Sequence, residues 1–295
     1  MDRLTPNASL ASATQRLHPK PFSMSLKAKL GLVVGLLYVI YASLQLDVTL
    51  ARFIAGMGHA ATFLDRMFPP SFERYNLLIK GLSESLEIAV LASTLGIFLA
   101  LPLGLLGARN LMPGWASWPA RAIVSFCRAL HPVIVAILFV KAVGFGALAG
   151  ILALTVASIG FIGKLFTEAI EEISLKQVEA VRATGASFAN VIIFSVLPQV
   201  FPRFIGFCTY QFDSNLRNST MVGIVGAGGI GGTLFSAFQR FDYDFVCAIL
   251  ISIITLIMLG EFLATIIRRV FLENLTIAEL FKGKPSVVPV NKVLP

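Results

Sequence analysis

Residues Glu179 to Pro198 read EAVRATGASFANVIIFSVLP, a polar segment between long apolar runs that we call the elbow segment. Glu179, Ala180 and Arg182 favour a helix, and Gly185 permits the positive φ of a turn between two short helices. Pro198 closes the segment before the next apolar run begins. The small side chains of the segment leave a shallow surface, which suits insertion into a groove on another protein. The alternative is an ordinary amphipathic connecting loop.

The composition around this segment is that of an integral membrane protein. Of the 295 residues, 56% are hydrophobic and 14% are charged, against about 25% charged residues in soluble domains. The mean hydropathy of +0.82 excludes a soluble globular protein. The net charge of +8 would fit nucleic-acid binding, but Lys and Arg lie at the ends of apolar runs, as charges that set membrane topology do. We therefore expect a lipid bilayer as surroundings and no nucleic acid.

Six apolar runs are candidate membrane spans. The first is at the short limit, since a spanning helix needs about 20 residues. A cleaved signal peptide is disfavoured there because no small-x-small cleavage site follows the run. The six runs lie at 30–46, 83–108, 122–140, 142–163, 199–225 and 245–267. They predict an all-α integral membrane protein with about six transmembrane helices.

Residues 47–80 interrupt the apolar pattern. Apolar residues recur at helical spacing from Leu50 to Phe68, opposite charged residues, until Pro69 and Pro70. This pattern predicts an amphipathic helix in the membrane interface. The expected organisation is a tail, a first transmembrane helix, this interfacial segment, a core domain that contains a loop at 165–198, and a second tail. Their ranges are 1–29, 30–46, 47–80, 81–270 and 271–295.

The distribution of positive charge predicts the orientation of the chain. Of the 24 Lys and Arg residues, fifteen lie in the two tails and in the loops 109–121 and 164–198. Six others lie in 47–80, at Lys141 and at Arg240, and three lie within spans. Positive charge concentrates on the cytoplasmic side of membrane proteins. Both termini and the elbow segment are therefore predicted to be cytoplasmic, and residues 47–80 periplasmic.

Polar residues inside the predicted spans are candidates for a translocation pathway. An isolated Arg at mid-membrane costs about 2.5–3.5 kcal/mol, so such residues usually face a cavity or a partner. The candidate pathway residues are Arg128, His131, Asp213, Asn215, Arg217 and Ser219. Arg128 and His131 are expected on one helix, and Glu261 is interpreted as a packing or hydrogen-bonding residue. Two alternatives are a purely structural i, i+4 pair of Asp213 and Arg217, and a membrane-embedded enzyme that uses both residues with His131.

A glycine-rich stretch follows the fifth predicted span. Gly226, Gly228 and Gly231 satisfy G-x-G-x-x-G, which indicates dinucleotide binding only after a strand and before a helix. A membrane span precedes it here, so we interpret Gly226, Gly228, Gly229 and Gly231 as glycines of a closely packed turn or gate. The sequence contains no G-x-x-x-x-G-K-[ST], so the chain is not expected to hydrolyse ATP itself. No cofactor or metal is expected in the chain.

The elbow segment resembles the EAA loop of permease subunits of ABC importers. In that family the pattern is E-A-A, a Gly six positions after the Glu, and then I-x-L-P. This chain keeps Glu179, Ala180, Gly185, Leu197 and Pro198 and departs at Val181 and Ser195. The resemblance implies the transmembrane fold of type I ABC importers, with the elbow segment as a cytoplasmic coupling helix.

Three further stretches resemble phosphonate importer permeases: Phe68–Phe72, Asp213–Thr220 and Val225–Gly231. The last stretch is also shared with methionine-importer permeases. The resemblance implies a permease of the bacterial inner membrane that carries phosphonate, phosphite or hypophosphite. It implies a separate ABC ATPase dimer that binds ATP and Mg²⁺, and a periplasmic or lipid-anchored binding protein.

The number of coupling loops in the chain predicts how many copies of the chain the transporter contains. A dimeric ATPase offers two equivalent grooves and this chain has one such loop, so a homodimer is expected. The alternatives are a permease for another small solute such as methionine, and a channel or secondary carrier that works without partners.

Overall fold

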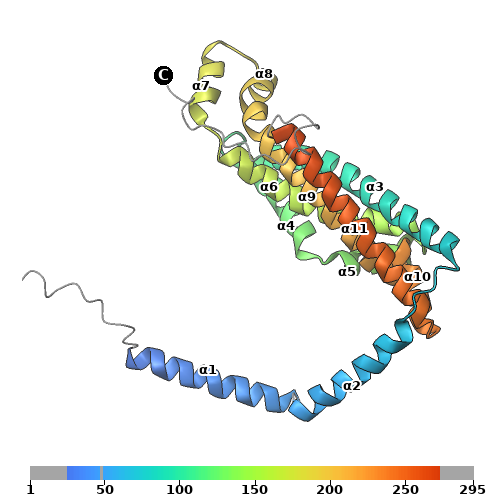
Figure 1. The fold of residues 1–295 in the computed structure, drawn as a ribbon. Helices are drawn as coiled ribbons and strands as arrows, with labels where there is room; N and C mark the ends of the chain where they lie inside the picture. Colours follow the sequence, from blue (N-terminus) through green and yellow to red (C-terminus); the bar gives the residue numbers. More distant parts are fainter. Residues whose placement is uncertain (1–24, 47–48, 273–295) are drawn as a thin grey trace, which may run out of the picture. The chain divides into compact units, whose positions relative to one another are not determined.

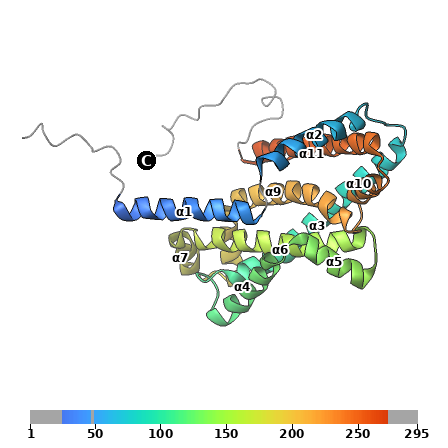
Figure 2. The ribbon, with the colours of Figure 1, turned by 90° about the horizontal axis from the view of Figure 1, so that it is seen from below.

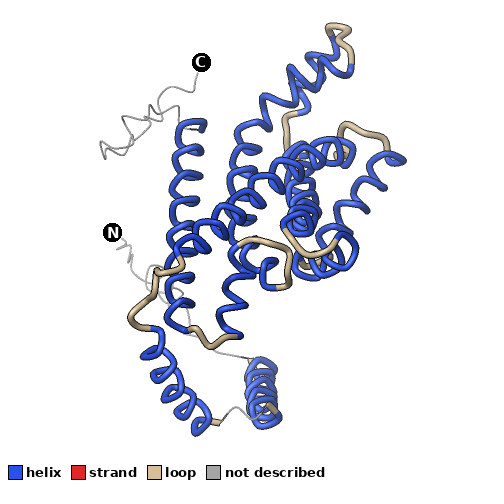
Figure 3. Tube along the Cα trace, turned by 90° about the vertical axis from the view of Figure 1, so that its right-hand side faces the viewer, coloured by secondary structure: helices blue, strands red, loops and turns tan. Residues whose placement is uncertain are grey.

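The computed structural model describes residues 25–46 and 49–272, with side chains to residue 269. These residues form eleven α-helices and one π-helix, and they contain no strand (Figure 3). The chain divides into two units, 1–65 and 66–295. Most of the predicted N-terminal tail and nearly all of the predicted C-terminal tail lie outside the described residues.

The first unit contains the first predicted span and most of the predicted amphipathic helix. Helix α1 runs from Leu26 to Gln45, and the Ser25 hydroxyl accepts a hydrogen bond from the Ala28 amide at its start, 3.3 Å away. It is long and apolar enough to cross a membrane. Helix α2, Leu50–Met67, ends just before Pro69, as the sequence predicts.

Four long helices organise the second unit: α3 (Tyr75–Gly107), α6 (Ala147–Glu171), α9 (Leu197–Ile224) and α11 (Tyr243–Leu272). Glycines allow α3 and α6 to approach closely. A Cβ on Gly96 would lie 2.2 Å from the Ser158 Cβ, and one on Gly104 would lie 2.6 Å from the Phe166 ring. Figure 2 shows α6 between α4 and α9, with α11 beyond α9. The helices that form these layers are the ones that position the candidate site.

The third predicted span is not one helix. The chain forms α4 (Gly114–Ala129) and α5 (Pro132–Val143), which are bent by 92° at Leu130 and His131. A residue that precedes proline avoids the helical conformation, and the His131 Nδ1 accepts a hydrogen bond from the Val133 amide, 3.3 Å away, as the N-cap of α5. The described residues thus provide five candidate spans, or six if the bent pair crosses as one.

Short helices lie at both ends of this unit (Figure 1). At one end, the chain between α6 and α9 forms α7 (Leu175–Ala183), α8 (Phe188–Val191) and a π-helix (Ile192–Val196). At the other end lie α5 and α10 (Ile230–Gln239), a helix that the sequence analysis did not predict. The fourth predicted span also begins later than expected, because Gly144 and Gly146 take positive φ before α6.

Candidate functional site

The elbow segment forms a helix, a turn and a helix, as its sequence predicts. Helix α7 stops at Ala183, and Gly185 has a φ of +78°, a conformation that side chains with a Cβ rarely adopt. The Ser187 hydroxyl then accepts a hydrogen bond from the Asn190 amide, 3.4 Å away, and caps α8. Figure 1 shows α7 and α8 projecting past the ends of α6 and α9.

Buried valines fasten the elbow segment to the helix bundle. Val191 and Val196 of the segment, and Val178 just before it, are each 1–2% exposed and belong to one apolar cluster with Phe166 and Ile170 of α6. Glu179, Ala180 and Gly185 are exposed on the other side. The residues that resemble the EAA loop therefore lie on the free surface of an anchored segment.

Polar contacts connect the two ends of the elbow segment. The Gln199 side chain accepts a hydrogen bond from the Ser174 amide, 3.0 Å away, and donates one to the Ser195 carbonyl at 2.8 Å. Arg203 of α9 forms an ion pair with Glu172, which follows α6. These contacts join the start of α7 to α9 and the end of α6 to α9.

A polar pocket of about 240 Å³ lies between α9 and α11. In it, the Arg217 guanidinium and the Asp213 carboxylate are 2.6 Å apart, as their i, i+4 spacing predicts. The Arg217 side chain is 43% exposed and that of Asp213 only 11%, and one Asp213 oxygen, Oδ1, is buried without a hydrogen-bond partner among the described residues. Glu261 and Arg268 of α11 also line the pocket.

The sequence analysis did not assign Glu261 or Arg268 to this group of residues. The available signal was a carboxylate within an otherwise apolar run, which usually faces a cavity or a partner. Only the packing of α11 on α9 brings these residues to Asp213 and Arg217.

Two predicted pathway residues of α9 face the bundle interior instead of this pocket. Asn215 and Ser219 are fully buried. The Asn215 amide donates hydrogen bonds to Ser93 of α3 at 2.9 Å and to Ser158 of α6 at 2.8 Å, and its oxygen accepts one from Gln211 at 2.9 Å. These contacts join three helices through hydrogen bonds, so the position of Asn215 is that of a structural cross-link.

Arg128 and His131 do not share a helix. Arg128 lies in the last turn of α4 and packs against α6, where a Cβ on Gly160 would come within 2.8 Å of its side chain. His131 lies beyond the 92° bend and caps α5. The expectation of two polar groups one turn apart is therefore wrong.

The glycine-rich stretch is a tight turn between α9 and α10, with positive φ at Gly226, Gly228 and Gly229. The Gly226 carbonyl accepts a hydrogen bond from the Gly146 amide, 3.0 Å away. A Cβ on Gly228 would come within 2.7 Å of the Ala147 backbone and of Glu84. The turn follows a helix rather than a strand, so close packing explains its glycines, as predicted.

Comparison with known proteins identifies relatives of the chain. Residues 93–274 match the family described as binding-protein-dependent transport system inner membrane component. The phosphite transport system permease protein PtxC of Stutzerimonas stutzeri is 37% identical over 217 residues, 73% of this chain and 79% of that protein. The phosphate-import permease protein PhnE of Mycolicibacterium smegmatis is 42% identical over 205 residues, which are 69% of this chain but only 38% of that longer protein.

A solved structure shows the same fold. The MetNI methionine ABC transporter, in an inward-facing conformation, contains a chain with 26% sequence identity and a TM-score of 0.60. The match covers 68% of this chain and 98% of that chain. The helical arrangement of the second unit is thus the fold of ABC importer permeases.

Proposed function

This chain belongs to the family of binding-protein-dependent transport system inner membrane components, and we propose that it imports a phosphorus oxyanion such as phosphonate, phosphite or hypophosphite. The observation that carries the proposal is the similarity to permeases named for phosphite and phosphate import. The methionine transporter is matched at lower identity and supports the fold more than the substrate.

The elbow segment is the proposed point at which a separate ABC ATPase acts on this chain. Its exposed face carries Glu179, Ala180 and Gly185, while its valine side is anchored in the bundle. A segment with a shallow exposed surface and a buried side packed in the bundle can pass a displacement by a bound ATPase to the bundle as a rigid-body movement. ATP and Mg²⁺ would be bound by that ATPase, and the elbow segment and both termini would lie in the cytoplasm.

We propose that the pocket between α9 and α11 is part of the translocation pathway. Its two arginines and two carboxylates lie on α9 and α11, two helices long and apolar enough to belong to membrane spans, and lipid contact would be costly for them. A second copy of the chain, related by twofold symmetry, would enclose this face and give the ATPase dimer two equivalent elbow segments. Mixed charge suits a conduit, because a conduit must release the ion that it receives.

The experiment is uptake into proteoliposomes that contain this chain, its ATPase and its binding protein. Labelled phosphite and methylphosphonate should enter, and excess unlabelled methionine should leave their uptake unchanged. Native mass spectrometry of the same complex should show two copies of this chain. Uptake of methionine without uptake of any phosphorus oxyanion would overturn the substrate assignment.

A further inference from the structure

A second polar pocket, of about 410 Å³, lies at the end of the unit that bears the elbow segment. Its lining comes from the loop after α3, from α4 and from α6, and its charged members are Arg109, Arg121 and Lys164. None of its lining residues belongs to the pocket between α9 and α11. Helix α6 lies between α4 and α9 (Figure 2), so the two pockets are separate.

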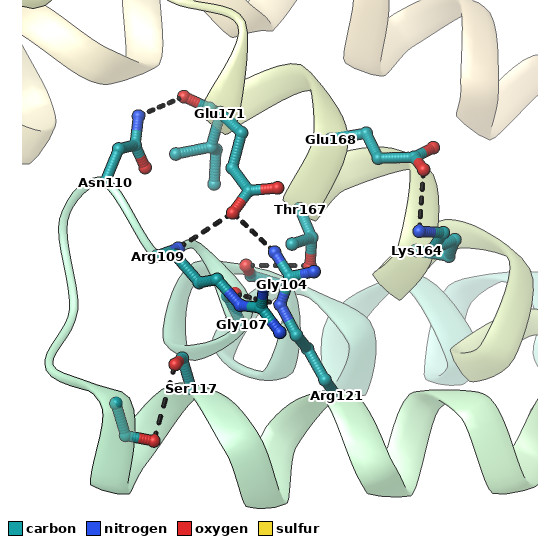
Figure 4. A network of polar contacts seen from close by, with 12 residues as sticks. Gly104, Gly107, Arg109, Asn110, Ser117, Arg121, Lys164, Thr167, Glu168 and Glu171 are labelled. Carbon is teal, nitrogen blue, oxygen red and sulfur yellow. Dashed lines mark hydrogen bonds and ion pairs between the residues drawn. The ribbon is translucent and has the colours of Figure 1, made fainter.

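Arg121 is held in place by the surrounding backbone. Its Nε donates a hydrogen bond to the Gly107 carbonyl, 2.8 Å away, and its guanidinium is paired with Glu171. The same Glu171 oxygen accepts a hydrogen bond from the Arg109 amide at 3.0 Å. The Asn110 side chain ties this loop to the Ile170 carbonyl at 2.8 Å. Figure 4 shows this network of contacts around Glu171, with Arg109, Asn110 and Arg121.

The positive charge of this pocket exceeds its negative charge. Glu171 is paired with Arg121, and Glu168 is paired with Lys164 at 2.7 Å. The Arg109 guanidinium is exposed and forms no ion pair with any residue that the structure describes. Arg121 and Lys164 each keep N–H groups beyond those used in these pairs, since a guanidinium has five donors and an ammonium three. Arg109, Arg121 and Lys164 thus carry three positive charges against the two carboxylates of Glu168 and Glu171, which leaves one positive charge in excess.

We propose that this pocket binds a phosphate-type oxyanion through Arg109, Arg121 and Lys164. A tetrahedral oxyanion accepts several charge-assisted hydrogen bonds at once, which suits a pocket lined by three cationic side chains. The site is built from the pocket geometry alone and does not depend on the transport assignment. The anion has two possible sources: a free phosphorus oxyanion, or the phosphate of an anionic lipid headgroup. Trp115 and Trp118, 82% and 73% exposed, are residues typical of the membrane interface.

The two tryptophans of the sequence, Trp115 and Trp118, provide a direct measurement. Trp118 lines the pocket, so the variant Trp115→Phe carries a single tryptophan, which lies at the site. The purified full-length Trp115→Phe protein, in nanodiscs of zwitterionic lipid, is titrated with inorganic phosphate and with methylphosphonate at constant ionic strength. A saturable change in Trp118 emission is expected, with sulfate and chloride as comparison anions.

Variants then assign the change to the pocket. Arg109→Gln and Lys164→Gln, each in the Trp115→Phe background, remove one cation while leaving the bonds of Arg121 to Gly107 and Glu171 in place. Each should weaken binding roughly tenfold or more, as expected for a lost charge-assisted hydrogen bond. Arg240→Gln, in the exposed C-cap of α10 at the other end of the unit, removes the same charge and should bind as the parent does.

A parallel measurement distinguishes the two sources of the anion. Native mass spectrometry of the full-length protein with added phosphatidylglycerol or phosphatidylcholine should reveal a retained phosphatidylglycerol if the headgroup is the ligand, and Arg109→Gln should lose it. A saturable phosphate response without a variant-sensitive lipid adduct assigns the site to the free oxyanion. Absence of both signals, or signals that Arg109→Gln and Lys164→Gln leave unchanged, overturns the proposal. Neither measurement requires transport, so its outcome is independent of the test of the proposed function.

Discussion

At Gly231, a methyl group in place of hydrogen would come within 1.9 Å of the Thr220 carbonyl oxygen. The neighbouring Gly232 has its closest such contact at 3.5 Å, which is ordinary van der Waals distance. Gly231→Ala should therefore destabilise the protein by about 1–3 kcal/mol through overpacking. Gly232→Ala should be neutral or slightly stabilising, because alanine favours a helix over glycine. Thermal unfolding of the two purified variants checks this, and equal unfolding midpoints would contradict the close packing of α9 on α10.

Single substitutions at Asp213 or Arg217 cannot distinguish a role in transport from a role in stability. Arg217→Gln alone leaves the poorly exposed Asp213 carboxylate without its partner, so loss of uptake could reflect instability. The double variant Asp213→Asn/Arg217→Gln removes both charges and should recover the thermal stability that the single variant loses. We expect its uptake of the oxyanion to stay at least roughly tenfold below wild type, because the charge-assisted contact is absent. If the double variant recovers both uptake and thermal stability, the ion pair of Asp213 and Arg217 has only a structural role.

Individual residues were predictable where the backbone or the spacing dictates the result. The positive φ of Gly185 and the pairing of Asp213 with Arg217 follow from local chemistry. The burial of Asn215 and the approach of Glu261 to Arg217 depend on which face of α9 meets each neighbouring helix. A single sequence carries no direct record of these helix contacts.

Among the elements, the elbow segment gives the sharpest prediction. No atom lies within 4 Å of a Cβ built on Gly185, so a substitution there changes the backbone preference without a clash. A β-branched residue opposes the positive φ at a cost of about 1–2 kcal/mol or more, whereas Asn tolerates it. In the assembled transporter, Gly185→Val should lower uptake per ATP hydrolysed, and Gly185→Asn should retain most of it. Equal coupling in both variants would show that the turn is not required.

Helix boundaries show where a single sequence stops being informative. Apolar length predicted that α3, α6, α9 and α11 exist, and it placed α9 within two residues at each end, but α3 begins eight residues earlier and α6 ends eight residues later than predicted. The break between α4 and α5 was signalled by His131 and Pro132, but the surrounding apolar run obscured it. The π-helix at Ile192–Val196, directly before α9, has no signature in the sequence that predicts it.

At the scale of the whole molecule, the chain is a transport permease, and we propose that a separate ATPase supplies its energy. The sequence lacks the phosphate-binding loop of an ATPase, and its family is binding-protein-dependent. Composition and one polar segment were enough to predict the class of protein. The proposed assembly of two copies, which would enclose the pocket between α9 and α11, is a property that the fold of one chain does not reveal.

The most direct test of this account is ATP-dependent uptake of labelled phosphite or methylphosphonate into proteoliposomes. We predict accumulation only when this chain, the binding protein and an active ATPase dimer are all present with ATP and Mg²⁺. An ATPase that binds but does not hydrolyse ATP should abolish accumulation. Uptake by this chain alone under an ion gradient, or chemical turnover of the substrate by this chain alone, would contradict the account.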